Sequence, residues 1–281
     1  MANDRPSPIA GTWYPGDREA LRRSVSLQVE AADARPPDGD VLGVIVPHAG
    51  HIYSGRVAAH AFCLLQGMQL DLLAVISPLH HPHPAQLLTT AHDAYLTPLG
   101  PVPVDASAVD DLGRAIQAHG GPLPHKVARD PEHALEIELP FAQVVLAPGF
   151  KLLPLMVRDL SPVVIEAAGH GLADVLQGRK AILVASSDLS HFYPDKKARS
   201  LDAAMLARIE SFDPLAVLSA EEEGAGFACG RGAIAAVLWA ARDLGADRVQ
   251  VLHYANSGDV TGDLSAVVGY GAAVILRSVH P

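Results

Sequence analysis

The stretch VLGVIVPHAGH (residues 41–51) decides the fold class of this 281-residue chain. Its first half is a continuous apolar run, which is typical of a strand buried on both faces of a sheet, and two histidines follow. The same order recurs twice, each time with a histidine soon after the apolar run, in LLAVISPLHH (72–81) and AILVASSDLSH (181–191). Repeated buried strands of this kind predict a parallel sheet.

Further apolar runs alternate with longer helical patterns along the chain. The remaining predicted strands are residues 151–157, 248–254 and 266–276. The predicted helices are residues 54–66, 105–118, 132–146, 162–177, 196–210 and 230–244, and Pro140 should kink or split the third of them. This alternation indicates the α/β class, with a mostly parallel central sheet flanked by helices. Since no repeat or long linker interrupts the pattern, residues 1–281 are predicted to form a single domain.

The composition argues against several classes of protein. The formal net charge is −10, so a basic surface for nucleic acid is not expected. Two cysteines cannot form a disulfide framework, and we find neither a signal peptide nor an apolar run of about 18 residues. We therefore expect a cytoplasmic protein without a membrane span. Glycine-rich nucleotide motifs, HExxH and GxSxG are missing from the sequence, whereas fourteen histidines favour metal or acid–base chemistry.

Histidines and an aspartate follow three of the predicted strands. Ligands of open α/β sheets bind beyond the carboxyl ends of the strands, so these side chains converge if the strands are parallel neighbours. They are His48, either His80 or His81, and Asp188 with His191. Neutral imidazoles and carboxylates suit Fe, Zn, Cu or Mn, which favours a shared metal or catalytic site. The alternative is that each histidine is an ordinary loop residue and that Asp188 caps a helix.

Cys229 lies in GFACGRGAI (226–234), just before a predicted helix. The unsatisfied N–H groups and the dipole of a helix N-terminus stabilise a thiolate, and Arg231 adds positive charge, so we expect a lowered thiol pKa. Cys229 is therefore a candidate metal ligand or nucleophile. The alternative is a small packed thiol, with Gly230 allowing the close approach.

Two further polar segments are candidates for the same site. In DPEHALEIE (130–138), Glu132 and His133 are interpreted as proton-relay residues or as partners that orient metal-bound histidines; the alternative is a solvated helix face for the glutamate. The segment YANSGDVTGD (254–263) is punctuated by glycine and lies between two predicted strands. It is interpreted either as a lip over the site or as a hairpin loop.

Several of these motifs occur together in one known family. They are AGTWYPGD (10–17), VPHAGHIYSGRVAAHAF (46–62), LHH (79–81), EHALEIELPF (132–141), SSDLSH (186–191), CGRGAI (229–234) and YANSGDVTGD (254–263). Because they span nearly the whole chain in the right order, the chain resembles the Memo family, which includes the bacterial and archaeal proteins called AmmeMemoRadiSam system protein B. This resemblance implies an α/β fold like that of class III extradiol ring-cleaving dioxygenases, with a metal site at the strand ends.

The resemblance also implies which residues form the site. It places metal ligands at His48, His80 and Cys229, with Asp188 and His191 lining the same pocket; the first histidine of the family's HH pair is the ligand. The dioxygenases hold Fe(II) with two histidines and a carboxylate, so a cysteine in the third place departs from their pattern. Ring cleavage therefore does not carry over directly. Ser77-Pro78-Leu79 also stands where the family usually has Gly-Pro-Ser before the pair.

Three functions are consistent with these observations. The first is a metal-dependent oxidoreductase that holds Fe(II), with copper or zinc as alternatives, and binds O2 and a small substrate; His191 or His133 would move a proton and Asp188 would orient a ligand. The second is a binding or adaptor protein with a vestigial cleft, in which Arg56 or Arg231 meets an anion such as a phosphopeptide. The third, which only the name of the family suggests, is an accessory component of a radical-SAM-linked system, whose partner would be a radical-SAM or AMMECR-type protein.

Overall fold

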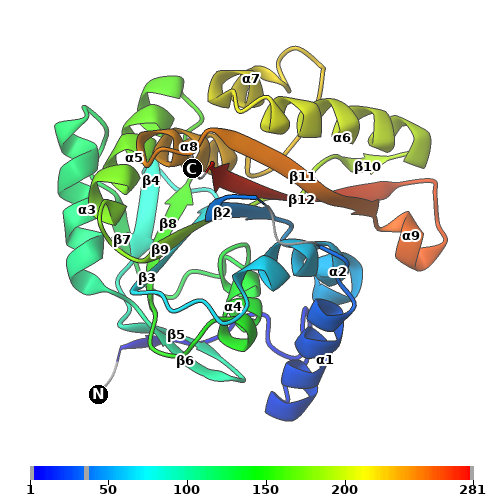
Figure 1. The fold of residues 1–281 in the computed structure, drawn as a ribbon, viewed down its shortest axis with the longest axis horizontal. Coiled ribbons are helices and arrows are strands. Elements are labelled where there is room, and N and C mark those ends of the chain that lie inside the picture. Colours follow the sequence, from blue (N-terminus) through cyan, green and yellow to red (C-terminus); the bar gives the residue numbers. More distant parts are fainter. Residues whose placement is uncertain (1–2, 35–37, 279–281) are drawn as a thin grey trace.

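Four of the predicted strands lie side by side in the middle of the central sheet (Figure 1). They pair in parallel in the order β2 (Asp40–Val46), β9 (Ala181–Ser186), β3 (Leu72–Pro78) and β8 (Lys151–Val157). The structure is a computed structural model and describes residues 3–34 and 38–278. Because β2, β9 and β3 are parallel neighbours, the polar segments that follow them leave the sheet at the same edge.

The sheet continues on both sides of this parallel part. Next to β2 lies β12 (Val267–Arg277), which is antiparallel to β2 and also pairs with β11 (Arg248–Asn256) and the short β10 (His191–Tyr193). Beyond β8, the sheet adds antiparallel β4 (Leu87–Thr90) and then β7 (His125–Val127), parallel to β4. The predicted α/β class is confirmed, and the sheet is mixed, with parallel pairing in its middle.

Successive residues of the middle strands point to opposite faces of the sheet and build two hydrophobic cores. In β3, Ala74 and Ile76 pack into one core, whereas Val75 packs into the other. The first core includes residues of α3 (Ala106–Ala118), α5 (Pro162–Leu176), α6 (Asp195–Glu210), α7 (Pro214–Ser219) and α8 (Arg231–Asp243). The second includes residues of α1 (Arg18–Glu30), α2 (His51–Phe62) and α4 (Leu139–Val145). Helices on both faces explain why these strands are apolar throughout.

The predicted helix over residues 132–146 differs from the structure. A 3₁₀ turn, η2 (Glu136–Glu138), leads directly into α4, and the residues before η2 are not helical. In this segment the side chain of Glu132 accepts hydrogen bonds from the backbone N–H groups of the two residues that follow it. Pro140 lies in the first turn of α4, where a missing N–H is tolerated, so the predicted break is present.

Several shorter or more polar elements were beyond the reach of the sequence patterns. α1 is mostly polar, buries Leu21, Val25 and Val29 along one face, and begins where the side chain of Asp17 accepts from the N–H of Ala20. The sequence patterns also missed β4, β7, β10 and α7, the short helix α9 (Gly258–Thr261), and a second, small sheet of β1 (Asp4–Arg5), β5 (Ala94–Thr97) and β6 (Gly100–Pro103). The predicted helix over residues 54–66 ends in a 3₁₀ turn, η1 (Cys63–Leu65). Among the described residues, no helix combines the length and the apolar character needed to cross a membrane.

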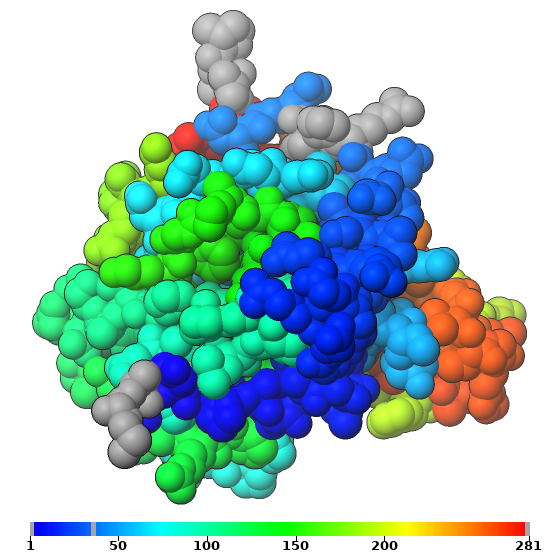
Figure 2. Space-filling view, turned by 90° about the horizontal axis from the view of Figure 1, so that it is seen from below, coloured from blue at the N-terminus to red at the C-terminus, as the bar shows by residue number. Residues whose placement is uncertain are grey.

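A buried arginine fastens the N-terminal segment to the rest of the fold. Arg5 is 1% exposed, and its guanidinium pairs with the carboxylates of Asp130 (2.9 Å) and Glu136 (2.5 Å). The same guanidinium donates to the carbonyl oxygen of Glu132 at 2.5 Å. Figure 2 shows the N-terminal segment, in dark blue, lying across one face of the molecule on its way to α1. Arg5 therefore ties this segment to the irregular chain that precedes α4.

Replacing Arg5 with leucine would leave the carboxylates of Asp130 and Glu136 buried without their cation. We expect Arg5→Leu to lower the free energy of unfolding by about 3–5 kcal/mol in urea denaturation. Arg114→Leu is the matched control, because the Arg114–Asp111 pair is exposed on α3 and is worth about 1 kcal/mol or less. Equal losses in the two variants would contradict the structural role assigned to Arg5.

Candidate metal centre

The polar segments that follow β2, β3 and β9 meet at a cavity of about 400 Å³. Its titratable lining includes His48, His80, His133, Asp188 and His191. The structure thus brings together the histidines and the aspartate expected at the strand ends, and adds the histidine that precedes η2. Of the two neighbouring histidines after β3, His80 lines the cavity and His81 does not.

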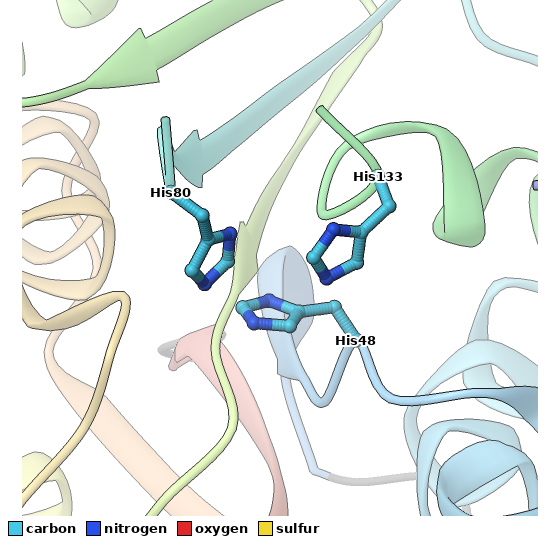
Figure 3. Close-up of side chains that lie close together, drawn as sticks. All are labelled: His48, His80 and His133. Carbon is cyan, nitrogen blue, oxygen red and sulfur yellow. The ribbon is translucent and has the colours of Figure 1, made fainter. Parts of the chain in front are cut away.

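Three of these imidazoles lie close together and turn toward one another (Figure 3). His48, His80 and His133 each offer a ring nitrogen, and these nitrogens all lie within 4.8 Å of one another, a spacing that could hold a metal ion. The His80 and His133 rings are nearly parallel, with centroids 4.9 Å apart, and the His48 ring is almost perpendicular to both. His133, which the sequence suggests as an acid–base or supporting residue, therefore has the position of a ligand.

One buried carboxylate holds two of the three histidines. Glu132 is 1% exposed; its Oε1 accepts a hydrogen bond from Nδ1 of His80 at 2.9 Å and lies 3.3 Å from Nδ1 of His133. The backbone N–H groups of His80, His133 and Ala134 donate to the same carboxylate at 2.5–2.9 Å. Burial opposes ionisation, but these donors and His80 lower the pKa of Glu132 to about 2. A carboxylate on Nδ1 leaves Nε2 of a ring available to a metal.

His48 is held by a different set of partners. Its Nδ1 lies 2.9 Å from Oγ of Ser186, at the end of β9. Its backbone N–H donates to Oδ1 of Asp188 at 2.8 Å, and the N–H of Ala49 donates to the same oxygen at 3.2 Å. Burial raises the pKa of Asp188 to about 7 although these N–H groups oppose the rise. Asp188 therefore fixes the turn after β2 instead of capping the helix that follows it in sequence.

The histidines of the cavity differ in their affinity for protons. Burial lowers the pKa of His48 well below its usual value and that of His133 to about 4, and His80 lowers both further. Burial also opposes protonation of His80, but its hydrogen bond to Glu132, together with the negative charges of Glu132 and Asp188, outweighs that effect and raises the pKa of His80. At neutral pH the His48 and His133 rings are therefore uncharged, which is the form that binds metals.

His191 has the features of a base. Its Nδ1 donates to the carbonyl oxygen of Leu189 at 2.8 Å, which leaves Nε2 as the nitrogen with a free lone pair. Burial of the ring lowers the pKa of His191, so the lone pair is present at neutral pH. As a residue that lines the cavity, it can accept a proton from a bound molecule.

Cys229 lies beside His48, with Sγ 3.1 Å from Nε2 of the ring. Burial, together with the Asp188 carboxylate, raises the pKa of the thiol, so the lowered pKa predicted from the start of α8 is wrong. Arg231, expected to add positive charge, forms an ion pair with Glu221. A bound cation stabilises a thiolate, so Cys229 remains a candidate ligand next to the three-histidine group.

The segment 254–263 does not line the cavity. It connects β11 to β12, and Asp259 accepts from the backbone N–H of Asn256 and pairs with Arg199, which favours the hairpin interpretation over a lip. Trp13 is a wall residue that the pattern at the strand ends does not reveal, and its ring lies 4.2 Å from that of His133. Its position inside the AGTWYPGD motif (10–17) is the signal that could have found it.

Comparison with known proteins extends the resemblance seen in the motifs. Residues 5–274 match the family described as Memo-like protein. A MEMO1 family protein of Methanosarcina mazei is 34% identical over 274 residues, which cover 96% of this chain and 98% of that protein. One from Aeropyrum pernix is 36% identical over 277 residues, covering 94% of this chain and 96% of its own. One from Nitrosopumilus maritimus is 31% identical over 271 residues, with coverage of 94% and 96%. The chain thus belongs to the Memo-like protein family.

Proposed function

We propose that this protein is a metal-dependent oxidoreductase that holds Fe(II) and acts on a small substrate together with O2. The observation that carries the proposal is the convergence of three imidazoles on one cavity, two of them beside a single buried carboxylate. Carboxylate-supported imidazoles fit iron, zinc and copper, and three protein ligands leave open positions for other molecules. Copper and zinc are the alternative metals.

We consider two ligand sets, one formed by residues of the cavity lining and one that adds Cys229 from outside that lining. The spacing of ring nitrogens favours His48, His80 and His133. The set implied by the family resemblance replaces His133 with Cys229, whose Sγ lies against Nε2 of His48. Both sets share His48 and His80, so the third ligand is what an experiment must decide.

Residues that line the cavity would bind the substrate and move its proton. When bound, iron would activate O2, and the substrate would be the source of the electrons that reduce it. His191, with a free Nε2, would accept a proton from a hydroxyl group of the substrate. Trp13 and Tyr53 form part of the cavity wall and would pack against an apolar ring. A cavity of about 400 Å³ suits a small molecule.

The metal content of anaerobically purified protein tests the centre itself. We expect about one iron or copper per chain in the wild type and none in His48→Ala, measured by elemental analysis. Loss of metal in His133→Ala with retention in Cys229→Ser would establish the three-histidine set, and the reverse would establish the set with the thiolate. A wild-type protein that holds no metal after anaerobic iron loading would sink the proposal.

Glu132 should affect metal affinity without being a ligand. In Glu132→Gln an amide replaces the anion that accepts from Nδ1 of His80, so we expect affinity for Zn²⁺ to fall about 10- to 100-fold in competition with a chromophoric chelator. Glu166→Gln on α5 is the matched control, since its side chain is 50% exposed and lies outside the cavity lining. Unchanged affinity in Glu132→Gln would show that the carboxylate does not support the ligands.

His191 should affect the reaction and not the metal. With catechols and related phenols as substrates, we expect His191→Ala to lower kcat for O2 uptake by about 10²- to 10⁴-fold while its metal content stays that of the wild type. His253→Ala, on β11 outside the cavity lining, is the control and should keep full activity. No O2 uptake by the iron-loaded wild type with any of these substrates would remove phenols as the substrate class.

A further inference from the structure

The hydrogen bonds around Ser186 outnumber the protons of its hydroxyl group. Oγ of Ser186 lies 2.6 Å from the carbonyl oxygen of Ala134, 2.8 Å from Oε1 of Glu138 and 2.9 Å from Nδ1 of His48. A hydroxyl donates one proton and accepts at two lone pairs. The Ala134 carbonyl can only accept, so it receives the single Ser186 proton. The other two neighbours must then bring their own protons.

The surroundings of Glu138 agree with a bound proton. Its side chain is buried, with the residue only 1% exposed, and it lies at the end of η2. Burial raises the pKa of Glu138 well above its usual value, and the Asp188 carboxylate raises it further, against the contact with Ser186. An ionised carboxylate would face the lone pairs of Ser186 Oγ, whereas a neutral carboxyl group donates its O–H to them.

We propose that Glu138 is a neutral carboxylic acid which, through Ser186, fixes His48 as the tautomer protonated at Nδ1. The Nδ1–H of His48 donates to Ser186 Oγ, and the lone pair remains on Nε2, the nitrogen that lies 3.1 Å from Sγ of Cys229. Nε2 is then the nitrogen available to a metal.

Glu138 is linked to His48 through Ser186 and is not among the residues that line the cavity, so its role is to position. The ionised carboxylate of Glu132 orients His80 by accepting directly from its Nδ1. The neutral carboxyl group of Glu138 orients His48 through Ser186. The effect on metal binding rests on the proposed function, whereas the protonation states do not.

Two spectroscopic measurements on the full-length chain, stripped of metal, test the proposal independently of the proposed function. The infrared spectrum at pH 7 should contain the C=O band of a protonated carboxyl group, and this band should be missing in Glu138→Gln. Because Asp188 is a second buried carboxyl group, the spectrum of Asp188→Asn identifies any band that comes from it. Histidine-ring ¹⁵N NMR should show His48 protonated at Nδ1 in the wild type and in Glu138→Gln, and this preference should be lost in Ser186→Ala. No band that disappears with Glu138, or a His48 ring protonated at Nε2, would overturn the proposal.

Measurements of metal affinity distinguish a positioning role of Glu138 from a contribution to the stability of the fold alone. Glu138→Gln keeps an N–H donor for Ser186 Oγ and should bind Zn²⁺ like the wild type, whereas Glu138→Leu removes the donor and should bind about 10- to 100-fold more weakly. Wild-type affinity in Glu138→Leu, or equal weakening in both variants, would contradict the positioning role. If Glu138→Leu does not fold, the glutamine variant and the two spectra decide. If the wild type binds no metal, the proposed function fails and the spectra still decide the state of Glu138.

Discussion

The carboxylate of Glu132 is the group on which the arrangement of the candidate centre depends. It joins the segment after β3 to the segment before η2, because it accepts hydrogen bonds from His80 and from the backbone of His133 and Ala134. Arg5 in turn donates to the carbonyl oxygen of Glu132, so the N-terminal segment is fastened at the same point. A full negative charge is stable in this buried position only because so many donors surround it.

Two glutamates six residues apart show how local donors decide the state of a buried carboxyl group. Glu132 and Glu138 are each 1% exposed, yet the pKa of the first is lowered and that of the second is raised. The first faces several N–H groups, whereas the second faces Ser186, whose single proton is directed to a carbonyl oxygen. The histidines linked to these two glutamates differ as well. The pKa of His80, which donates to Glu132, is raised, whereas the pKa of His48, which is linked to Glu138 through Ser186, is lowered.

The sequence predicts part of the site well, for a simple reason. Apolar runs mark β2, β3 and β9, and parallel pairing alone brings the residues after them to one edge, which places His48 and His80.

The thiol of Cys229 illustrates what the sequence cannot supply. A helix terminus stabilises a charged group by about 0.3–1 kcal/mol, whereas burial shifts a pKa by up to about 3–5 units, each worth about 1.4 kcal/mol. The depth of burial is a property of the whole fold. The sequence did not indicate that His133 joins His48 and His80 in one group, because residues 132–146 have a helical pattern, and that pattern does not reveal that Glu132 accepts hydrogen bonds from the two N–H groups that follow it.

The pairing of β2 has a consequence for the order in which the protein matures. Its partners in the sheet are β9 and β12, which come from the last part of the chain, so β2 leaves the ribosome long before either exists. Pairings of such long sequence separation are slow to form. Until β9 is made, His48 lacks both the hydroxyl at its Nδ1 and the carboxylate that holds its backbone. A nascent chain therefore cannot present the finished group of imidazoles, and the proposed metal could be held there only after β9 has been made.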